Sequence, residues 1–240
     1  MFLVSAIKII FLLGFLVFIH ELGHFSVAKF CKVRVNEFSI GFGPVLLKKQ
    51  GKETMYALRC IPLGGFVSME GENEPSDKQG SFSKASVLKR IAIVMAGGLV
   101  NIVFAIIVFW FISIYYVGIK DSFTVVLNFI SAMFEGIKQI FTGNVSVDQM
   151  MGPVGISNVV SKTSLFVDFA YILSVISLSL GVTNLMPFPP LDGGKVVLLI
   201  IEGIRKKALD TRVETAIQSV GFLILIVLSI FVTYNDIIKL

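Results

Sequence analysis

Two histidines four residues apart lie inside the first long apolar stretch of the chain, in the sequence FLVFIHELGHFSVAKF. On a helix, His20 and His24 occupy the same face one turn apart, so both imidazoles can reach one metal ion. The H-E-x-x-H pattern is typical of a zinc site in which the intervening glutamate acts as a general base. Ionisable groups are costly in a membrane span and mark a functional site there. We therefore predict that His20 and His24 bind Zn²⁺ and that Glu21 activates a water molecule.

A carboxylate is the expected third ligand, because catalytic zinc usually has three protein ligands and an open position. The chain has no third histidine, and Cys31 and Cys60 are poorly placed. Asp192 is the best candidate, in the stretch NLMPFPPLDGGK. The prolines there prevent a regular helix, and broken helices at membrane depth line polar cavities. Gly193 and Gly194 allow a close approach of the backbone to a neighbour. The alternative is that Asp192 only caps the next helix.

The composition indicates an integral membrane protein that is mainly α-helical. Of 240 residues, 55% are hydrophobic and 15% charged, and the mean hydropathy of +0.86 exceeds that of soluble domains. Four stretches are long enough to be transmembrane helices, at 7–28, 91–119, 166–186 and 216–233. A fifth apolar stretch, 123–141, carries Glu135 and Lys138, so we expect an interfacial helix there.

The distribution of basic residues predicts the orientation in the membrane. Residues 29–90 hold 11 of the 21 lysines and arginines, and residues 192–215 hold five more. Residues 120–165 hold only three, matched by three acidic residues. The positive-inside rule places the first two segments in the cytoplasm, and both termini outside it. The net charge of +5 then reflects topology and the lipid bilayer, with no nucleic acid as partner.

A small β-hairpin region is expected after the first helix. Glycines and Pro44 separate short runs rich in Val, Phe, Tyr and Thr, which predict strands near 45–49, 54–60 and 65–70. Open strand edges cannot face lipid, so this region must be cytoplasmic or membrane-associated around a polar cavity. Its edge could accept an extended peptide as an added strand, although a purely structural hairpin explains the same pattern.

Taken together, the motifs resemble the site-2 protease family of intramembrane zinc metalloproteases, especially the bacterial regulator of sigma-E proteases and their Gram-positive relatives. HELGH and NLMPFPPLDGG carry most of this resemblance. The further matches extend it over nearly the whole chain, and they are GFGP, PLGGFVSMEGE, SFSKASVLKRIAIVMAGGLVN, GPVGI and TYNDIIKL.

The resemblance implies both a metal site and a substrate site. The implied zinc ligands are His20, His24 and Asp192. Glu21 is then the residue that activates water. The hairpin near 52–70, with Gly64 and Gly65, is implied to hold an extended substrate. Asn184 is implied to grip the substrate backbone, and a hydrogen bond at a helix end is its alternative role.

Two features depart from the family pattern. Relatives usually have a PDZ domain between spans two and three, whereas residues 119–165 are too few for one. We expect 1–118 to be a first catalytic half, 119–165 a short extracytoplasmic connector and 166–240 a second catalytic half. The chain is either a naturally compact member or one from which the domain was removed. The family's Ala-Gly-Pro is Ala96-Gly97-Gly98 here, a change expected to touch no ligand.

The expected activity is that of a zinc metalloendopeptidase in the bacterial cell membrane. Its substrates would be transmembrane segments of single-span proteins, such as anti-sigma factors or remnant signal peptides. The oligomeric state and natural substrate do not follow from the sequence. Two other functions compete: a metal transporter, which would need more ligands and a path across the bilayer, and an inactive scaffold, which would not need Glu21.

Overall fold

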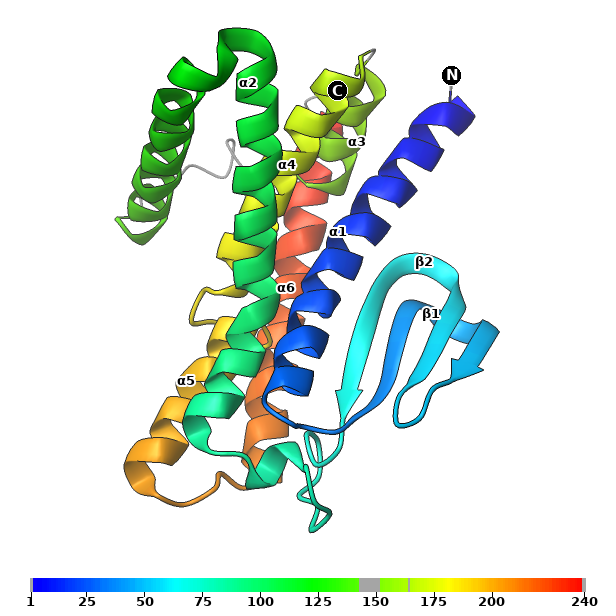
Figure 1. Cartoon of the computed structure of the whole chain (residues 1–240), viewed down its shortest axis with the longest axis vertical. Coiled ribbons are helices and arrows are strands. Elements are labelled where there is room, and N and C mark those ends of the chain that lie inside the picture. The colour runs from blue at the N-terminus through cyan, green and yellow to red at the C-terminus, as the bar shows by residue number, and fades with distance from the viewer. Residues whose placement is uncertain (1, 143–151, 164, 239–240) are drawn as a thin grey trace. The chain divides into compact units, whose positions relative to one another are not determined.

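The computed structural model of the 240-residue chain describes residues 2–142, 152–163 and 165–238 (Figure 1). Four of its helices have segments that are long and apolar enough to cross a membrane. These are Ala6–Phe30 of α1 (Phe2–Phe30), Val87–Gln139 of α2 (Val87–Phe141), α4 (Phe166–Asn184) and α6 (Thr211–Ile238). The prediction of a mainly helical membrane protein with four transmembrane helices is confirmed.

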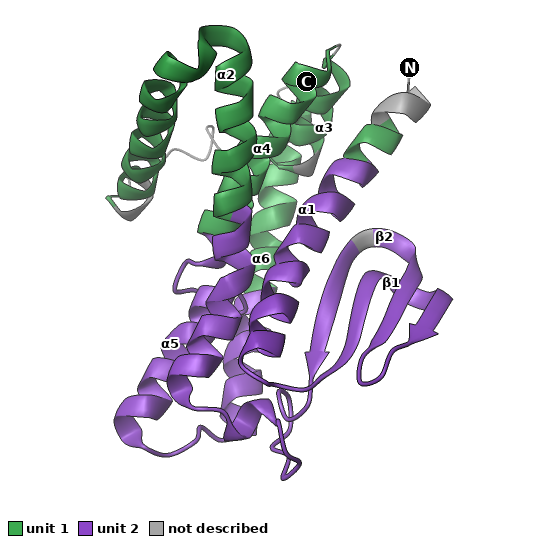
Figure 2. Cartoon of the chain, in the orientation of Figure 1, with its two compact units in different colours: residues 1–9, 102–182, 223–240 green, residues 10–101, 183–222 purple. Residues whose placement is uncertain are grey.

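The chain folds as two compact units, which Figure 2 distinguishes by colour. Unit 1 comprises residues 1–9, 102–182 and 223–240, and unit 2 comprises residues 10–101 and 183–222. Unit 2 therefore holds most of α1, the strands, the start of α2, helix α5 (Asp192–Arg205) and the start of α6. All of the predicted site residues belong to unit 2.

The strands of unit 2 form one bent antiparallel hairpin of β1 (Val35–Gln50) and β2 (Met55–Met69). Residues 37–40 of β1 pair on one side with residues 65–68 and on the other with residues 55–58. Residues 45–50 of β1 also pair with residues 55–59 at the start of β2, from Gln50↔Met55 to Val45↔Arg59. The hairpin is thus a small curled sheet in which the first half of β1 is central.

The predicted strands 45–49, 54–60 and 65–70 fall on these two strands apart from residues 54 and 70, but the observed strands are longer. Gly41 and Gly43 have φ angles of +85° and +81°, which glycine adopts without steric cost. They bend β1 without ending it, so strand structure begins already at Val35. Likewise, β2 continues through the Pro62–Gly64 segment that the sequence suggested as a break.

A buried apolar cluster joins the elements that carry the predicted metal ligands. Its members come from the end of α1, the two strands, the short helix η1 (Phe82–Lys84), α2 and α5. They are Ala28, Val33, Val35, Met69, Phe82, Ile93, Val94 and Leu199. Burial of these side chains holds the C-terminal part of α1 and the start of α5 in one core.

In unit 1, α2 changes direction at Gly118. This residue has φ 79° and ψ 171°, values outside the helical region, and the chain after it turns back along α2 (Figure 1). Stacked rings at 4.0 Å between Phe109 and Phe129 join the two segments. Trp110 Nε1 donates a hydrogen bond to Ser122 Oγ at 3.2 Å. A helix over 123–141 is therefore present, and its place at a membrane interface stays a prediction.

A charged side chain from another helix contacts the chain at each end of helix α3 (Pro153–Ser161). The Gly155 N–H donates a hydrogen bond to Asp236 Oδ2 at 2.8 Å, and Lys8 Nζ donates one to the Thr163 carbonyl oxygen at 2.8 Å. A carboxylate at the N-terminus and an ammonium just past the C-terminus both complement the helix dipole. Within unit 1, α3 therefore connects the start of α1 to the end of α6.

We expect Asp236→Ala to lower the free energy of unfolding by about 1–2 kcal/mol, because α3 loses its N-terminal acceptor and a favourable charge. The midpoint of thermal unfolding in detergent measures the effect. Asp121→Ala is the matched control, since Asp121 is exposed and its side chain has no ion pair or hydrogen bond among the described residues. Equal midpoints for the two variants would contradict this role of Asp236.

Candidate metal centre

Three potential ligand atoms converge in unit 2, from helices α1 and α5. His20 Nε2 and His24 Nε2 lie 3.1 Å apart, and Asp192 Oδ2 lies 3.2 Å from the first and 3.4 Å from the second. His20 is buried, and the other two residues are largely covered. The predicted His-His-Asp set is thus brought together at the apices of a nearly equilateral triangle.

The geometry of this triangle fits a zinc ion. A tetrahedral site with bonds of about 2.0–2.1 Å places its ligand atoms roughly 3.3–3.4 Å apart. Asp192 Oδ2 is buried and, in the described part of the chain, makes no hydrogen bond of good geometry despite its nearby imidazoles. Two imidazoles and a carboxylate with one position left open are also a donor set typical of catalytic zinc. The residues present therefore suit the metal.

Asp192 reaches this position because the chain breaks its helix just before it. Helix α4 ends at Asn184 and α5 starts at Asp192, with Leu191 rather than Asp192 as the N-cap residue. A Cβ atom at Gly193 would overlap the carbonyl oxygens of Leu185 and Met186. The glycine thus lets α5 start directly against the preceding turn, which is the close approach that the sequence suggested.

Groups behind the imidazoles fix their orientation. His24 Nδ1 lies 2.8 Å from the Ile93 carbonyl oxygen, so Nδ1 carries the proton and Nε2 is left to face the other ligands. The side-chain amide of Asn101, which is fully buried, lies 3.5 Å from His20 Nδ1. The amide atom nearest to this ring is Asn101 Nδ2. If His20 also presents a bare Nε2, its Nδ1–H must donate, and the amide must then be turned over so that its oxygen accepts.

Helix α2 passes close to both imidazoles at Gly97. A Cβ atom there would lie 2.7 Å from His20 Cε1 and would collide with His24 Nε2. The residue that departs from the family pattern is the next one, Gly98, and the expectation that this change touches no ligand stays a prediction. Gly97, Asn101 and the Ile93 carbonyl all come from α2, and the sequence analysis identified none of them. A double glycine inside an apolar helix was the one available signal.

The ligand triangle opens into a cavity of about 250 Å³ that Glu21 also lines. Apolar side chains of β2, namely Phe66, Val67 and Met69, form part of its wall. Glu72 and Lys195 line it as well, and their side chains form an ion pair at 2.7 Å. The cavity therefore combines a possible base, a strand and polar groups.

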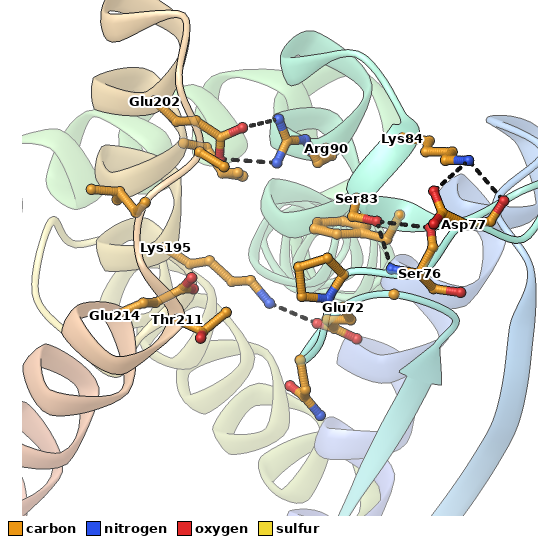
Figure 3. Close-up of a pocket in the computed structure, with 17 residues that line it drawn as sticks. Glu72, Ser76, Asp77, Ser83, Lys84, Arg90, Lys195, Glu202, Thr211 and Glu214 are labelled. Carbon is orange, nitrogen blue, oxygen red and sulfur yellow. Dashed lines mark hydrogen bonds and ion pairs between the residues drawn. The ribbon is translucent and has the colours of Figure 1, made fainter.

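A second pocket of about 330 Å³ adjoins this cavity, and Glu72 and Lys195 line both (Figure 3). Arg90 and Glu202 form a two-pronged ion pair in its wall, with distances of 3.0 and 2.5 Å. Its charged lining suits water rather than lipid. The Glu72–Lys195 pair is thus common to the metal cavity and to a pocket whose lining suits water.

The turn after β2, which carries Glu72, is held by Glu70. Its carboxylate accepts hydrogen bonds from Ser76 Oγ at 2.6 Å and from Asn36 Nδ2 at 3.2 Å. These hydrogen bonds, that from Ser76 first, lower the pKa of Glu70 below its ordinary value. Glu70 thus stays ionised, and its contacts stay intact, at neutral pH.

The predicted substrate-binding residues fall in different places. A Cβ atom at Gly65 would lie 3.4 Å from Glu21 Cγ, so β2 runs directly beside the candidate base. Gly64 has φ +122° and packs against the Phe42 ring. Asn184 ends α4 and is not among the residues that line the metal cavity. Among the described residues, 65–69 pair with β1 on one side only, which leaves a strand edge open.

A comparison with known protein families agrees with this geometry. The sequence profile of Peptidase family M50 matches residues 8–228. The chain belongs to peptidase family M50. The matched residues include most of α1, both strands and α5. All residues of the ligand triangle and of the metal cavity therefore lie within the part of the chain that matches the family.

Individual relatives extend the comparison. A Clostridium acetobutylicum protein named provisionally as a zinc metalloprotease is 27% identical over 321 aligned residues, covering 94% of this chain and 95% of the relative. The zinc metalloprotease RasP of Shouchella clausii is 42% identical over 116 residues, or 48% of this chain and 28% of RasP. The protease RseP of Yersinia pestis is 45% identical over 107 residues, or 42% of this chain and 24% of RseP.

The alignment of 321 residues is longer than the 240 residues of this chain, so this relative carries segments that have no counterpart in these 240 residues. Between α2 and α4, the described residues form only the nine-residue helix α3. The described part of this interval thus holds no PDZ domain, as its length predicted. Residues 143–151 of the expected connector lie outside the described residues.

We expect Gly97→Ala to weaken zinc binding roughly 10- to 100-fold, because a methyl group would overpack the site by about 1–3 kcal/mol and displace the imidazoles. Titration of the purified protein against a zinc chelator measures the affinity. Gly136→Ala, in the same helix, is the control because a Cβ atom there meets nothing within 4 Å. Equal affinities in the two variants would show that α2 does not constrain the histidines.

We expect Asn101→Leu to weaken zinc binding by about tenfold, because His20 Nδ1–H would lose its acceptor and the ring its fixed orientation. Asn101→Asp keeps an acceptor oxygen and should retain most of the affinity. The same chelator titration compares both variants with the wild type. If Asn101→Leu bound zinc normally, the amide would serve packing alone.

Proposed function

We propose that this M50 peptidase is an intramembrane zinc metalloprotease that cleaves transmembrane segments of single-span membrane proteins. The observation that carries the proposal is the His20–His24–Asp192 triangle beside Glu21. Its two histidines lie on α1, a helix apolar enough to span a membrane, and its aspartate begins α5. The relatives named zinc metalloproteases support zinc as the cofactor. An ion held by these three groups would acidify a water molecule and polarise a peptide carbonyl.

Glu21 supplies the proton transfer that peptide hydrolysis needs. It is the carboxylate next to His20 in sequence, and it lines the cavity without belonging to the ligand triangle. In our proposal it takes a proton from the attacking water and delivers it to the leaving amide nitrogen. The hydrogen bond from His24 Nδ1–H to Ile93 and the buried Asn101 amide keep both imidazoles oriented during this cycle.

The open edge of β2 suits a substrate in extended form. A peptide added as a strand along residues 65–69 would pass Gly65, where β2 approaches Glu21. A transmembrane helix must unwind to present a carbonyl there, so small or helix-breaking residues near the cleaved bond would favour cleavage. We further propose that Gly64 shapes this edge and that Asn184 contacts the substrate backbone.

The proposed setting is the cytoplasmic membrane of a bacterium, with the polar cavity open toward the cytoplasm and both termini outside it. The basic residues of 29–90 and 192–215 support this orientation. In this topology, 1–118 and 166–240 are the two catalytic halves, and 119–165 is the extracytoplasmic connector. Anti-sigma factors and remnant signal peptides are the classes of substrate to test first.

The two competing functions account less well for the site. A transporter needs ligands along a path, whereas the described residues contain one cluster able to hold a metal, His20, His24 and Asp192. A scaffold that only binds metal has no use for a carboxylate at Glu21, yet this residue lines the cavity. Hydrolysis uses every one of these groups.

Glu21→Gln should retain zinc but lower fragment formation from a tagged single-span substrate roughly 100- to 10,000-fold, because proton transfer is lost. Asp192→Asn should lower both zinc content and cleavage. Co-expression with the substrate, followed by immunoblotting, measures cleavage, and elemental analysis of the purified protein measures zinc. Glu74→Gln, an exposed carboxylate outside the cavity, is the control and should cleave normally.

Identical fragments from wild type and Glu21→Gln would mean that another enzyme cuts the substrate, which would refute the proposed role. Zinc uptake by proteoliposomes that contain the purified protein, without cleavage of any substrate, would favour transport instead. Loss of zinc in Glu21→Gln would make this carboxylate a ligand rather than a base.

A further inference from the structure

A third pocket lies in unit 2, apart from the metal cavity, and shares no lining residue with it. Its volume is about 560 Å³, and it is formed where α1 ends and α2 begins. Cys31 and Lys32 of its lining directly follow the apolar segment of α1, which ends at Phe30. Lys89 lies in the first turn of α2, whose apolar segment begins at Val87. The pocket therefore sits at one end of two membrane spans.

The lining of this pocket is strongly basic. Its charged residues are Lys32, Arg34, Lys84, Lys89 and Glu53. Glu53 is neutralised by Lys29 at 2.9 Å, and Lys84 pairs with Asp77 at 3.0 Å. The first turn of α2 holds no acidic residue.

Three of these cations lack a counter-charge from the protein. Within the described ranges, the side chains of Lys32, Arg34 and Lys89 make no ion pair and are exposed. Two of them, Lys32 and Arg34, flank the buried Val33, which holds their backbone in place. Three positive charges around one concave site attract an anion, and guanidinium and ammonium groups both suit phosphate oxygens.

Two exposed apolar residues directly precede residues that line this basic pocket. Phe30, just before Cys31, is 88% exposed, and Leu88, just before Lys89, is 79% exposed. Each is the kind of side chain that packs against acyl chains when it ends a membrane span. A phosphate group with an apolar tail matches both features, whereas free phosphate matches only the basic lining.

We propose that this pocket binds the phosphate headgroup of an anionic phospholipid, with the acyl chains lying against Phe30 and Leu88. The bound lipid would supply the negative charge missing around Lys32, Arg34 and Lys89. Basic pockets between membrane helices are known to hold anionic headgroups on the cytoplasmic side. The site is independent of zinc and of proteolysis, because no residue of the ligand triangle belongs to it.

The test uses the purified full chain in detergent, with phosphatidylglycerol as probe and phosphatidylcholine as the neutral reference. Lipid retained by the protein is measured by native mass spectrometry, and stabilisation by the thermal midpoint. The wild type should retain phosphatidylglycerol preferentially. The triple variant Lys32→Gln/Arg34→Gln/Lys89→Gln should bind it about fivefold more weakly per charge removed.

The matched control is the triple variant Arg205→Gln/Lys206→Gln/Lys207→Gln. It removes the same charge from exposed residues that do not line the pocket. It should retain phosphatidylglycerol nearly as well as the wild type. Equal losses in the two triple variants would overturn the proposal, since they would indicate general attraction to negative lipid.

A third measurement repeats the lipid-retention assay with inorganic phosphate added at millimolar concentration. A lipid site should keep its phosphatidylglycerol, because free phosphate lacks the acyl chains. Full displacement would overturn the proposal in favour of a soluble anion. Bound zinc is measured in every variant as a check on folding, and single variants at Lys89 provide a milder change if the triple variant loses zinc.

Discussion

The convergence of two imidazoles and a carboxylate on one point is the interaction around which this protein is organised. Such groups are costly in an apolar environment unless they are paired or bound to a metal. The helices must therefore pack closely enough to hold them in place. A Cβ atom at Gly23 would lie 2.6 Å from the Ala96 carbonyl oxygen, which shows how tightly α1 and α2 meet there. Glycine, which has no side chain, thus allows the close helix contact that holds the reactive side chains in place.

The elements around the ligand triangle serve opposite needs of the same reaction. Hydrolysis requires water, whereas membrane spans exclude it, and the pocket that shares Glu72 and Lys195 with the metal cavity has a charged lining that suits water. The substrate must be extended, whereas transmembrane segments are helical, and in our proposal an extended chain adds to the unpaired edge of β2. Binding of an extended substrate would explain why this largely helical membrane protein contains an antiparallel hairpin.

Residue types and spacing predicted that His20, His24 and Asp192 converge, because a one-turn separation on a helix and a Pro-rich break before Asp192 are local properties. The strand boundaries were less predictable, since Gly41 and Gly43 bend β1 instead of ending it. The contacts of Gly97 and Asn101 with the histidines could not be predicted at all. They depend on how α2 packs against α1, and the apolar sequence of α2 does not specify which of its faces turns inward.

The Glu72–Lys195 ion pair joins the turn after β2 to the first turn of α5, one helical turn from Asp192. Its side chains are about one-fifth exposed, so water screens the pair only partly. A polypeptide that displaces the end of β2 would pull through this link on the helix that carries the carboxylate ligand. If a substrate adds to β2 as we propose, any movement of the end of this strand would act through the Glu72–Lys195 pair on the helix that carries Asp192.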